Sequence, residues 1–286
     1  MLLVCLLCLS GEAMAQIKVE LNIKRRLFLV YEPIIATVAV TNLAGRDIVL
    51  EDKGVHRWFG FTIVTGEGGI VSPINVNYGI DPLLIPAGAT VRRSVNLTPL
   101  YAIRSPGLYR IRAAIYGAEF DKYFPSPTDN IQVVQGHVLW QQNVGVPEGE
   151  EGAGEMRTVK LLNHRGAKQN TLYVQVENSD QGIVYGIYKL GRLLRAQEPE
   201  ILLDSQNNIH ILQVNAPKAY LYSKVSPNGE WLGQTSYLGT KSRPSLTKLP
   251  DGQVAIRGGK PDVPAQLPPG MTEAPKLSDR PAGIPQ

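Results

Sequence analysis

The chain has 286 residues, enough for about two domains. Only 19% of the residues are charged, and the formal net charge of +4 comes without a dense basic cluster, which argues against nucleic-acid binding. The 28 glycines and 21 prolines interrupt the chain at short intervals. This composition favours short strands joined by turns over long helices, and it predicts an all-β fold.

Residues 1–15 are predicted to be a secretory signal peptide. A short apolar run precedes Ala13-Met14-Ala15, a pattern typical of cleavage between Ala15 and Gln16. The run is too short to cross a bilayer as a helix, so no membrane span is expected. No Lys or Arg precedes the run, which leaves a buried N-terminal strand or a lipoprotein acylated at Cys8 as alternatives. The predicted location is secreted, periplasmic or at the cell surface.

The mature chain is expected to use no cofactor and no metal. Both cysteines, Cys5 and Cys8, lie in the predicted signal peptide, so cleavage removes disulfides, thiolate nucleophiles and cysteine-ligated zinc. Four histidines occur, none of them at metal-ligand spacing: His56, His137, His164 and His210. Each is expected at the surface; His210 alternates with two isoleucines, which predicts the solvent face of a strand.

Residues 17–140 are predicted to form a β-sandwich. Ile17–Ile23 alternates apolar and polar residues, and the region contains about seven or eight short strands in all, with turn signals every 8–15 residues. In Ser105-Pro106-Gly107-Leu108-Tyr109, a tyrosine follows a turn at the start of a late strand. That is the sequence signature of the tyrosine corner of an immunoglobulin-like sandwich, so Tyr109 is predicted to be a structural residue.

Four short motifs in this region resemble secreted immunoglobulin-like modules, including macroglobulin-type domains and intracellular-proteinase-inhibitor sandwiches. They are Tyr31-Glu32-Pro33-Ile34, Val38-Ala39-Val40-Thr41-Asn42, Leu84-Ile85-Pro86-Ala87-Gly88 and the Tyr109 corner. The resemblance implies a fold and says little about function, because such sandwiches serve as binders, spacers and inhibitors.

Residues 141–156 are predicted to be a linker. They are rich in glycine and glutamate and have no face to bury. An acidic metal site is the alternative, but glutamates separated by glycines provide no fixed geometry.

Residues 157–259 are predicted to be a domain of antiparallel β repeats. Similar segments start at Asn170, Asn208 and Gln253, with offsets of 38 and 45 residues. A period near 40 with several strands per unit resembles the blades of sialidase-like propellers. A propeller needs about four to eight blades, and this chain supplies two and a half. The alternatives are a relic fragment, a ring completed by a second chain, or a small closed sheet of another kind.

Two aspartates in this domain, Asp204 and Asp251, are interpreted as equivalent turn residues rather than as paired catalytic carboxylates. Residues 260–286 form a Pro-rich tail with few large apolar side chains, and we expect it to be disordered.

The sequence favours an exported, non-enzymatic interaction or structural protein that binds a protein or a cell-surface polysaccharide through its sandwich loops. Tyr78 is the candidate binding residue, since Trp58 and Phe59 are expected in the core. One alternative is a secreted peptidase inhibitor that uses the loop from Pro73 to Pro82. Another is a partial propeller enzyme completed by homo-oligomerisation through the repeat domain. No nucleophile elbow, phosphate-binding loop or dinucleotide-binding motif is present.

Overall fold

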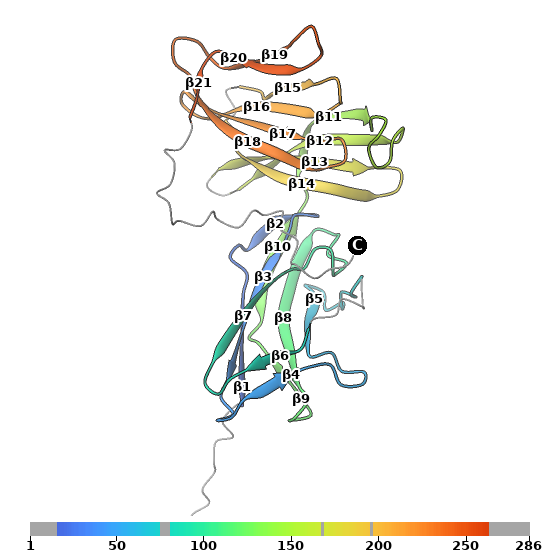
Figure 1. The fold of residues 1–286 in the computed structure, drawn as a ribbon, viewed down its shortest axis with the longest axis vertical. Helices are drawn as coiled ribbons and strands as arrows, with labels where there is room; N and C mark the ends of the chain where they lie inside the picture. Colours follow the sequence, from blue (N-terminus) through green and yellow to red (C-terminus); the bar gives the residue numbers. More distant parts are fainter. Residues whose placement is uncertain (1–15, 75–80, 167–168, 195–196, 263–286) are drawn as a thin grey trace, which may run out of the picture. The chain divides into compact units, whose positions relative to one another are not determined.

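The computed structural model describes residues 16–74, 81–166, 169–194 and 197–262. Every regular element in these ranges is a β-strand, so the prediction of an all-β fold is confirmed (Figure 1). No helix in the described ranges is long and apolar enough to cross a membrane. The described residues divide into two compact units: residues 16–28 with 33–133, and Leu29–Glu32 with residues 134–262.

The N-terminal unit consists of two antiparallel sheets and a short strand pair. One sheet has the order β1 (Ile17–Asn22), β3 (Ile35–Asn42), β7 (Thr90–Asn96). The other has the order β2 (Leu27–Leu29), β10 (Asp129–Val134), β8 (Gly107–Gly117), β5 (Phe59–Thr65), with β9 (Lys122–Pro125) also paired to β8. The short pair is β4 (Ile48–Leu50) with β6 (Leu83–Ile85). Strands β1 and β8 lie in contact across the two sheets, which makes this unit a sandwich.

Strand β8 follows the alternation expected of a half-buried strand. Tyr109, Ile111 and Ala113 are buried, and Arg110 and Arg112 between them are exposed. The hydroxyl of Tyr109 donates a 2.7 Å hydrogen bond to the backbone carbonyl of Ser105, four residues upstream. This bond ties the turn before β8 to the core, which is the geometry of a tyrosine corner.

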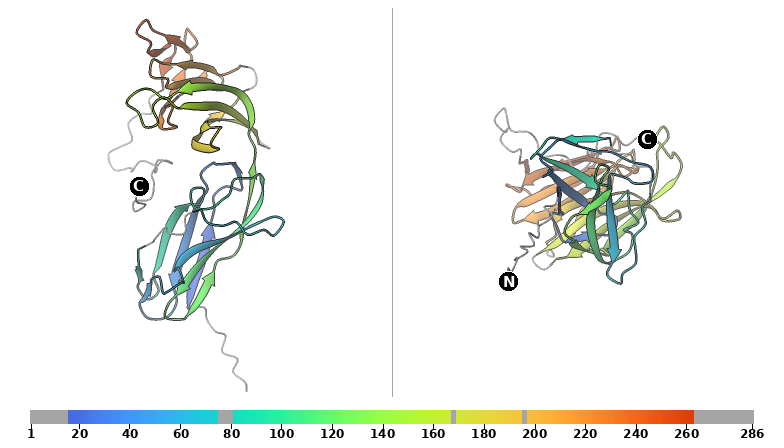
Figure 2. Two further views of the ribbon diagram at one scale, coloured as in Figure 1. Left: turned by 90° about the vertical axis from the view of Figure 1, so that its right-hand side faces the viewer. Right: turned by 90° about the horizontal axis from the view of Figure 1, so that it is seen from below.

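The C-terminal unit is a stack of two antiparallel sheets and a hairpin (Figures 1 and 2). The first sheet has the order β11 (His137–Gly145), β12 (Met156–Arg165), β13 (Asn170–Asn178), β14 (Ile183–Arg192). The second has the order β15 (Glu200–Leu203), β16 (Ile209–Ala216), β17 (Ala219–Val225), β18 (Trp231–Leu238), β21 (Lys260–Pro261). The hairpin is β19 (Ser245–Lys248) with β20 (Val254–Arg257).

The core of this unit lies between its two sheets. Branched aliphatic residues from both sheets form it: Val144, Val159, Leu161, Leu172, Val174, Val176, Leu190, Ile209, Ile211 and Val225. The opposite face of the first sheet has its own small cluster of Leu162, Tyr173 and Ile187, against which Leu29 and Tyr31 pack. The turn Leu29–Glu32 therefore closes one end of the stack.

That turn is held in a conformation that a bulky residue seldom adopts. Tyr31 has a φ of 69°, in the left-handed region. The Glu32 carboxylate accepts a 2.9 Å hydrogen bond from the amide of Leu29, and the Glu32 amide donates to the Leu29 carbonyl at 3.0 Å. These two bonds, with the packing of Leu29 and Tyr31, offset the strain.

The predicted linker is wrong, because residues 141–145 belong to β11. Strand β11 pairs with β12 up to Gly145, which lies opposite Met156. Residues 146–155 form the hairpin connection between the two strands. The amide of Val146 donates to the carbonyl of Glu155 at 2.9 Å. Composition alone could not reveal this, since a long hairpin connection and an interdomain linker are both rich in glycine and charge.

The predicted repeats need a similar correction. The 45-residue offset relates two real hairpins, β15–β16 and β19–β20, which have equivalent turn bonds. The 38-residue offset does not relate equivalent strands, because Asn170 starts the third strand of its sheet and Asn208 precedes the second strand of the next. The stack also begins at β11, earlier than the predicted start at residue 157.

The two chain ends lie mostly outside the described residues. This applies to the predicted signal peptide with Ala15 and to the tail from residue 263. Lys260–Pro261, predicted as part of the tail, form strand β21 against β18. The carbonyl of Gln16 accepts a 2.8 Å hydrogen bond from the amide of Leu43.

Replacing Tyr109 by Phe should lower the free energy of unfolding of the N-terminal unit by about 1 kcal/mol, because the Ser105 carbonyl loses its donor. Tyr123→Phe is the matched control, since Tyr123 is exposed and its hydroxyl lies 3.4 Å from the ring of His56. Urea denaturation measures both. Equal stability of the Tyr109→Phe variant and the parent would show that the corner bond contributes nothing.

Candidate functional site

A hydrogen-bonded polar cluster is formed by Asp204, His210 and Tyr222, on or next to strands of the second sheet of the C-terminal unit. Nε2 of His210 lies 3.0 Å from Oδ2 of Asp204, and Nδ1 lies 2.7 Å from the hydroxyl of Tyr222. Asn208 donates to Asp204 through both its amide and its side chain, at 2.9 and 3.0 Å. The ammonium of Lys224 lies 3.3 Å from Asp204.

Burial and hydrogen bonding set the protonation states in this cluster. Burial by itself would raise the pKa of Asp204, but hydrogen bonds from His210, Asn208 and Gln206 lower it well below its usual range. Burial lowers the pKa of His210, against the opposing effect of Asp204. A neutral His210 therefore donates from Nε2 to Asp204 and accepts from Tyr222 at Nδ1.

An aspartate, a histidine and a hydroxyl in line have the composition of a catalytic relay, but here the relay is enclosed. The side chains of Asp204 and His210 are 1% and 3% exposed, and the hairpin β19–β20 lies next to β15 and β16. A substrate cannot reach the histidine in this arrangement. We assign the cluster a structural role, in which it ties the β15–β16 turn to β17.

Two sequence interpretations are thereby corrected. His210 is buried rather than on a solvent face, because β16 is covered on both faces and alternation distinguishes faces only in a half-buried strand. Asp204 is not the counterpart of Asp251. The turn bond from the Asp204 amide to the Asn208 carbonyl is matched by one from Leu249 to Gln253, so Leu249 occupies the equivalent position.

The remaining histidines lie closer to the predicted surface. His56 and His137 are exposed, and His164 is half-buried, with its pKa lowered by burial against the charge of Glu32. His56 stacks on Tyr116 at 4.6 Å between ring centroids. Among the described residues, no group of three or more His, Cys, Asp or Glu side chains is placed to hold a metal ion.

Of the three predicted aromatic candidates, the structure describes Trp58 and Phe59. Trp58 and Phe59 are buried in the N-terminal unit, with their rings 5.4 Å apart. Tyr78 lies outside the described residues, as do residues 75–80 of the loop from Pro73 to Pro82. Binding by Tyr78 and inhibition by that loop therefore stay predictions.

A surface that sequence reasoning missed runs along β11, the first strand of its sheet. Within the described ranges, β11 pairs with β12 on one side and with no strand on the other. Its nine residues contain no Lys, Arg, Asp, Glu or Pro. Val138 and Leu139 are 41% and 44% exposed, and a bulge leaves Leu139 unpaired. Lys and Pro are residues with which proteins usually protect a free edge, and both are missing from this strand.

The other sheet edges of this unit are partly covered by the chain itself. Strand β18, which also lacks charged residues, is covered by β21 at its C-terminal end, over Tyr237 and Leu238. Strand β15 is only four residues long, and Glu200 in it accepts a 2.8 Å hydrogen bond from the amide of Leu246. In β14, the carbonyl of Leu190 accepts from Gln234 at 2.8 Å, and the amide of Arg192 donates to Asn215 at 3.0 Å.

Glycines allow a further closure of β14. A Cβ on Gly186 would lie 2.4 Å from the carbonyl oxygen of Gly229, so only glycine allows this turn to approach the strand so closely. The hydroxyl of Tyr188 donates to the same carbonyl at 2.7 Å. On β11 the described residues show such a contact at the C-terminal end, where the side-chain amide of Asn207 donates a 2.9 Å hydrogen bond to the carbonyl of Gly145.

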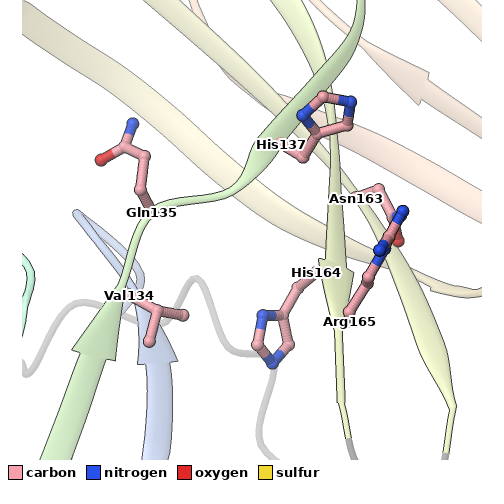
Figure 3. A pocket seen from close by; sticks show the side chains of 6 residues that line it. All are labelled: Val134, Gln135, His137, Asn163, His164 and Arg165. Atoms are coloured by element: carbon pink, nitrogen blue, oxygen red, sulfur yellow. The ribbon is translucent and has the colours of Figure 1, made fainter.

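A pocket of about 430 Å³ lies at the N-terminal end of β11 (Figure 3). Its lining residues are Val134, Gln135, His137, Asn163, His164 and Arg165. Figure 3 shows Asn163 and Arg165 on one side of β12 and His164 turned to the other side, towards Val134. Oδ1 of Asn163 and Nε2 of His164 are buried without a hydrogen-bond partner in the structure.

Comparison with known proteins gives no relationship that would identify this pocket or the β11 edge. No family model matches the chain. No curated protein matches it significantly.

The C-terminal unit should lose stability as the pH falls. The folded pKa values of His210 and Asp204 are both lowered, so the unfolded chain binds more protons than the folded one. The contribution of His210 is complete above its ordinary value of 6.5 and is lost below it; that of Asp204 is lost below 3.8. Half-buried His164 adds to the first of these windows. Urea midpoints followed by tryptophan fluorescence should therefore decrease from about pH 7.5 to pH 5.5.

The His210→Gln variant tests whether His210 causes this pH dependence. Its urea midpoint should change less between about pH 7.5 and pH 5.5 than that of the parent. The exposed control, His137→Gln, should show the same change as the parent. An unchanged slope in His210→Gln would exclude His210 as a source.

Proposed function

We propose that this chain is an exported, non-enzymatic interaction protein that binds an extended protein segment by adding it as a strand along β11. The free edge of β11 carries the proposal. Strand addition to an exposed edge gives affinity through main-chain hydrogen bonds and specificity through the side chains on either face. Export rests on the predicted signal peptide, and the choice of a protein partner over a polysaccharide rests on the edge.

Three properties of β11 support this function. Its length of nine residues offers a ladder longer than a typical strand of five or six. Its lack of charge avoids the cost of removing ionised groups from water when a partner strand covers them. The exposed Val138 and Leu139 provide apolar surface that a partner would bury.

The proposal keeps the predicted class of protein and moves the binding surface from the sandwich loops to a sheet edge. In the N-terminal unit, edge strand β5 is also uncharged, but it is partly covered. Val71 donates to Ile63 at 2.9 Å, and the amide of Phe61 donates to the hydroxyl of Tyr101 at 3.1 Å. Strands β1 and β7 carry lysine, glutamate or arginine.

The test is selection of peptides from a displayed random library on the full chain, followed by dissociation constants from fluorescence anisotropy. Leu139→Lys should weaken the selected peptides by about tenfold or more, because a lysine on the edge must be desolvated by the incoming strand. Leu238→Lys is the control, since Leu238 is similarly exposed on β18, next to the edge that β21 covers. Equal losses in both variants, or a selection that yields no peptide, would contradict the proposal.

A further inference from the structure

The outer face of the sheet that contains β8, in the N-terminal unit, carries two exposed arginines. Arg110 and Arg112 alternate along β8 with buried residues of the sandwich core, so both side chains point away from that core. Positions two apart on a strand are separated by about 7 Å, so the two guanidinium groups follow one another along β8. Neither arginine takes part in an ion pair with a residue that the structure describes.

The neighbours of these arginines on the same face are neutral and polar. Asn130 of β10 lies directly opposite Arg110, and Thr62 of β5 lies directly opposite Arg112. The hydroxyl of Thr128 accepts hydrogen bonds from Nη2 and Nε of Arg112, at 2.9 and 3.3 Å. All three neighbours are exposed. We call the two arginines and these three neighbours the cationic strip.

No carboxylate offsets the charge of the cationic strip on this face. Within the described residues, the outward positions of β5, β8 and β10 hold no Asp or Glu. Asp129 of β10 belongs to the inward set, is 9% exposed and pairs with Arg26. Glu67 lies in the turn after β5, beyond the last residues that pair β5 with β8. The face therefore presents uncompensated positive charge to solvent.

The outer face of the other sheet in the same unit has mixed charge. Lys18 and Glu20 of β1 form an ion pair at 2.7 Å. Glu20 and Arg92 lie in one row across that sheet, on either side of Ala39. Uncompensated positive charge is therefore a property of the β8 face and not of both outer faces of the sandwich.

We propose that the cationic strip binds an acidic polysaccharide whose sugar units carry carboxylate groups. Arg110 and Arg112 keep N–H donors beyond those that they use within the protein, and a guanidinium can bind a carboxylate through two parallel hydrogen bonds. Asn130 and Thr62 offer an amide and a hydroxyl group to the hydroxyl groups of the sugars. The inference does not depend on strand addition along β11, so either proposal can fail alone.

The composition of the face distinguishes this ligand from other polyanions. Proteins bind single-stranded nucleic acids with aromatic side chains that stack on the bases. In the described residues, no exposed aromatic side chain occupies an outward position of β5, of β10 or of β8 between Leu108 and Ala114. An acidic polypeptide offers carboxylates but few hydroxyl groups for the neighbours of the arginines. A carboxylated polysaccharide supplies both kinds of group along one chain.

The experiment measures binding of the full chain to immobilised alginate and polygalacturonate, two polymers of uronic acids, with neutral dextran as the reference surface. The parent should bind both uronates and not dextran. The double variant Arg110→Gln/Arg112→Gln should bind about tenfold or more weakly, because each lost charged hydrogen bond contributes to affinity. Lys18→Gln/Arg92→Gln is the matched control, since it removes the same amount of charge from exposed positions on the opposite outer face. It should keep the affinity of the parent, and both variants should keep its urea midpoint.

Three results would overturn the inference. Equal losses in the two double variants would show that net charge alone governs binding. No binding of the parent to either uronate would exclude the ligand. If poly-glutamate binds the parent as tightly as alginate and depends on the same two arginines, the partner is an acidic polypeptide and the assignment to a polysaccharide is wrong.

Discussion

Backbone amides and carbonyls along the rim of a β-sheet must find partners or stay in water, and this requirement governs how the C-terminal unit is built. Its two sheets and one hairpin have the strand content of two and a half propeller blades, too few to close a ring. Other segments of the same chain instead cover parts of the exposed faces and edges of the two sheets. Leu29–Glu32 covers the outer face of the first sheet, hairpin β19–β20 lies against the second, and β21 returns to pair with β18.

The edge of β11 departs from this pattern along most of its nine residues, up to Gly145, to which Asn207 donates a hydrogen bond. Strand β14 shows that this unit can protect a long edge when it needs to, through Gln234, Asn215 and the close approach of Gly229. Residues that break a local rule of good design without an evident structural gain are candidates for function. An uncharged strand with two exposed aliphatic side chains and a pocket with an unsatisfied amide oxygen at one end fits that description.

Sequence patterns predicted the strands of this protein well and their partners poorly. The alternation around Tyr109 sufficed because β8 is buried on one face. His210 could not be placed, because the layer that covers its strand comes from residues far along the chain. The same limit hid the candidate site. The uncharged run from His137 to Gly145 is visible in the sequence, but whether a strand has one neighbour or two depends on the order of strands in the sheet.

Amide hydrogen exchange of the full chain tests most directly whether β11 is an open edge. With every second β11 amide directed away from β12, the account predicts that those amides exchange much faster than the amides of β12 and β13. The amides of β14 should exchange more slowly than the outward-facing amides of β11, because side chains and a turn cover the edge of β14. Uniform protection along β11 in the free protein, equal to that of β12, would show that the edge is already occupied and would contradict the account.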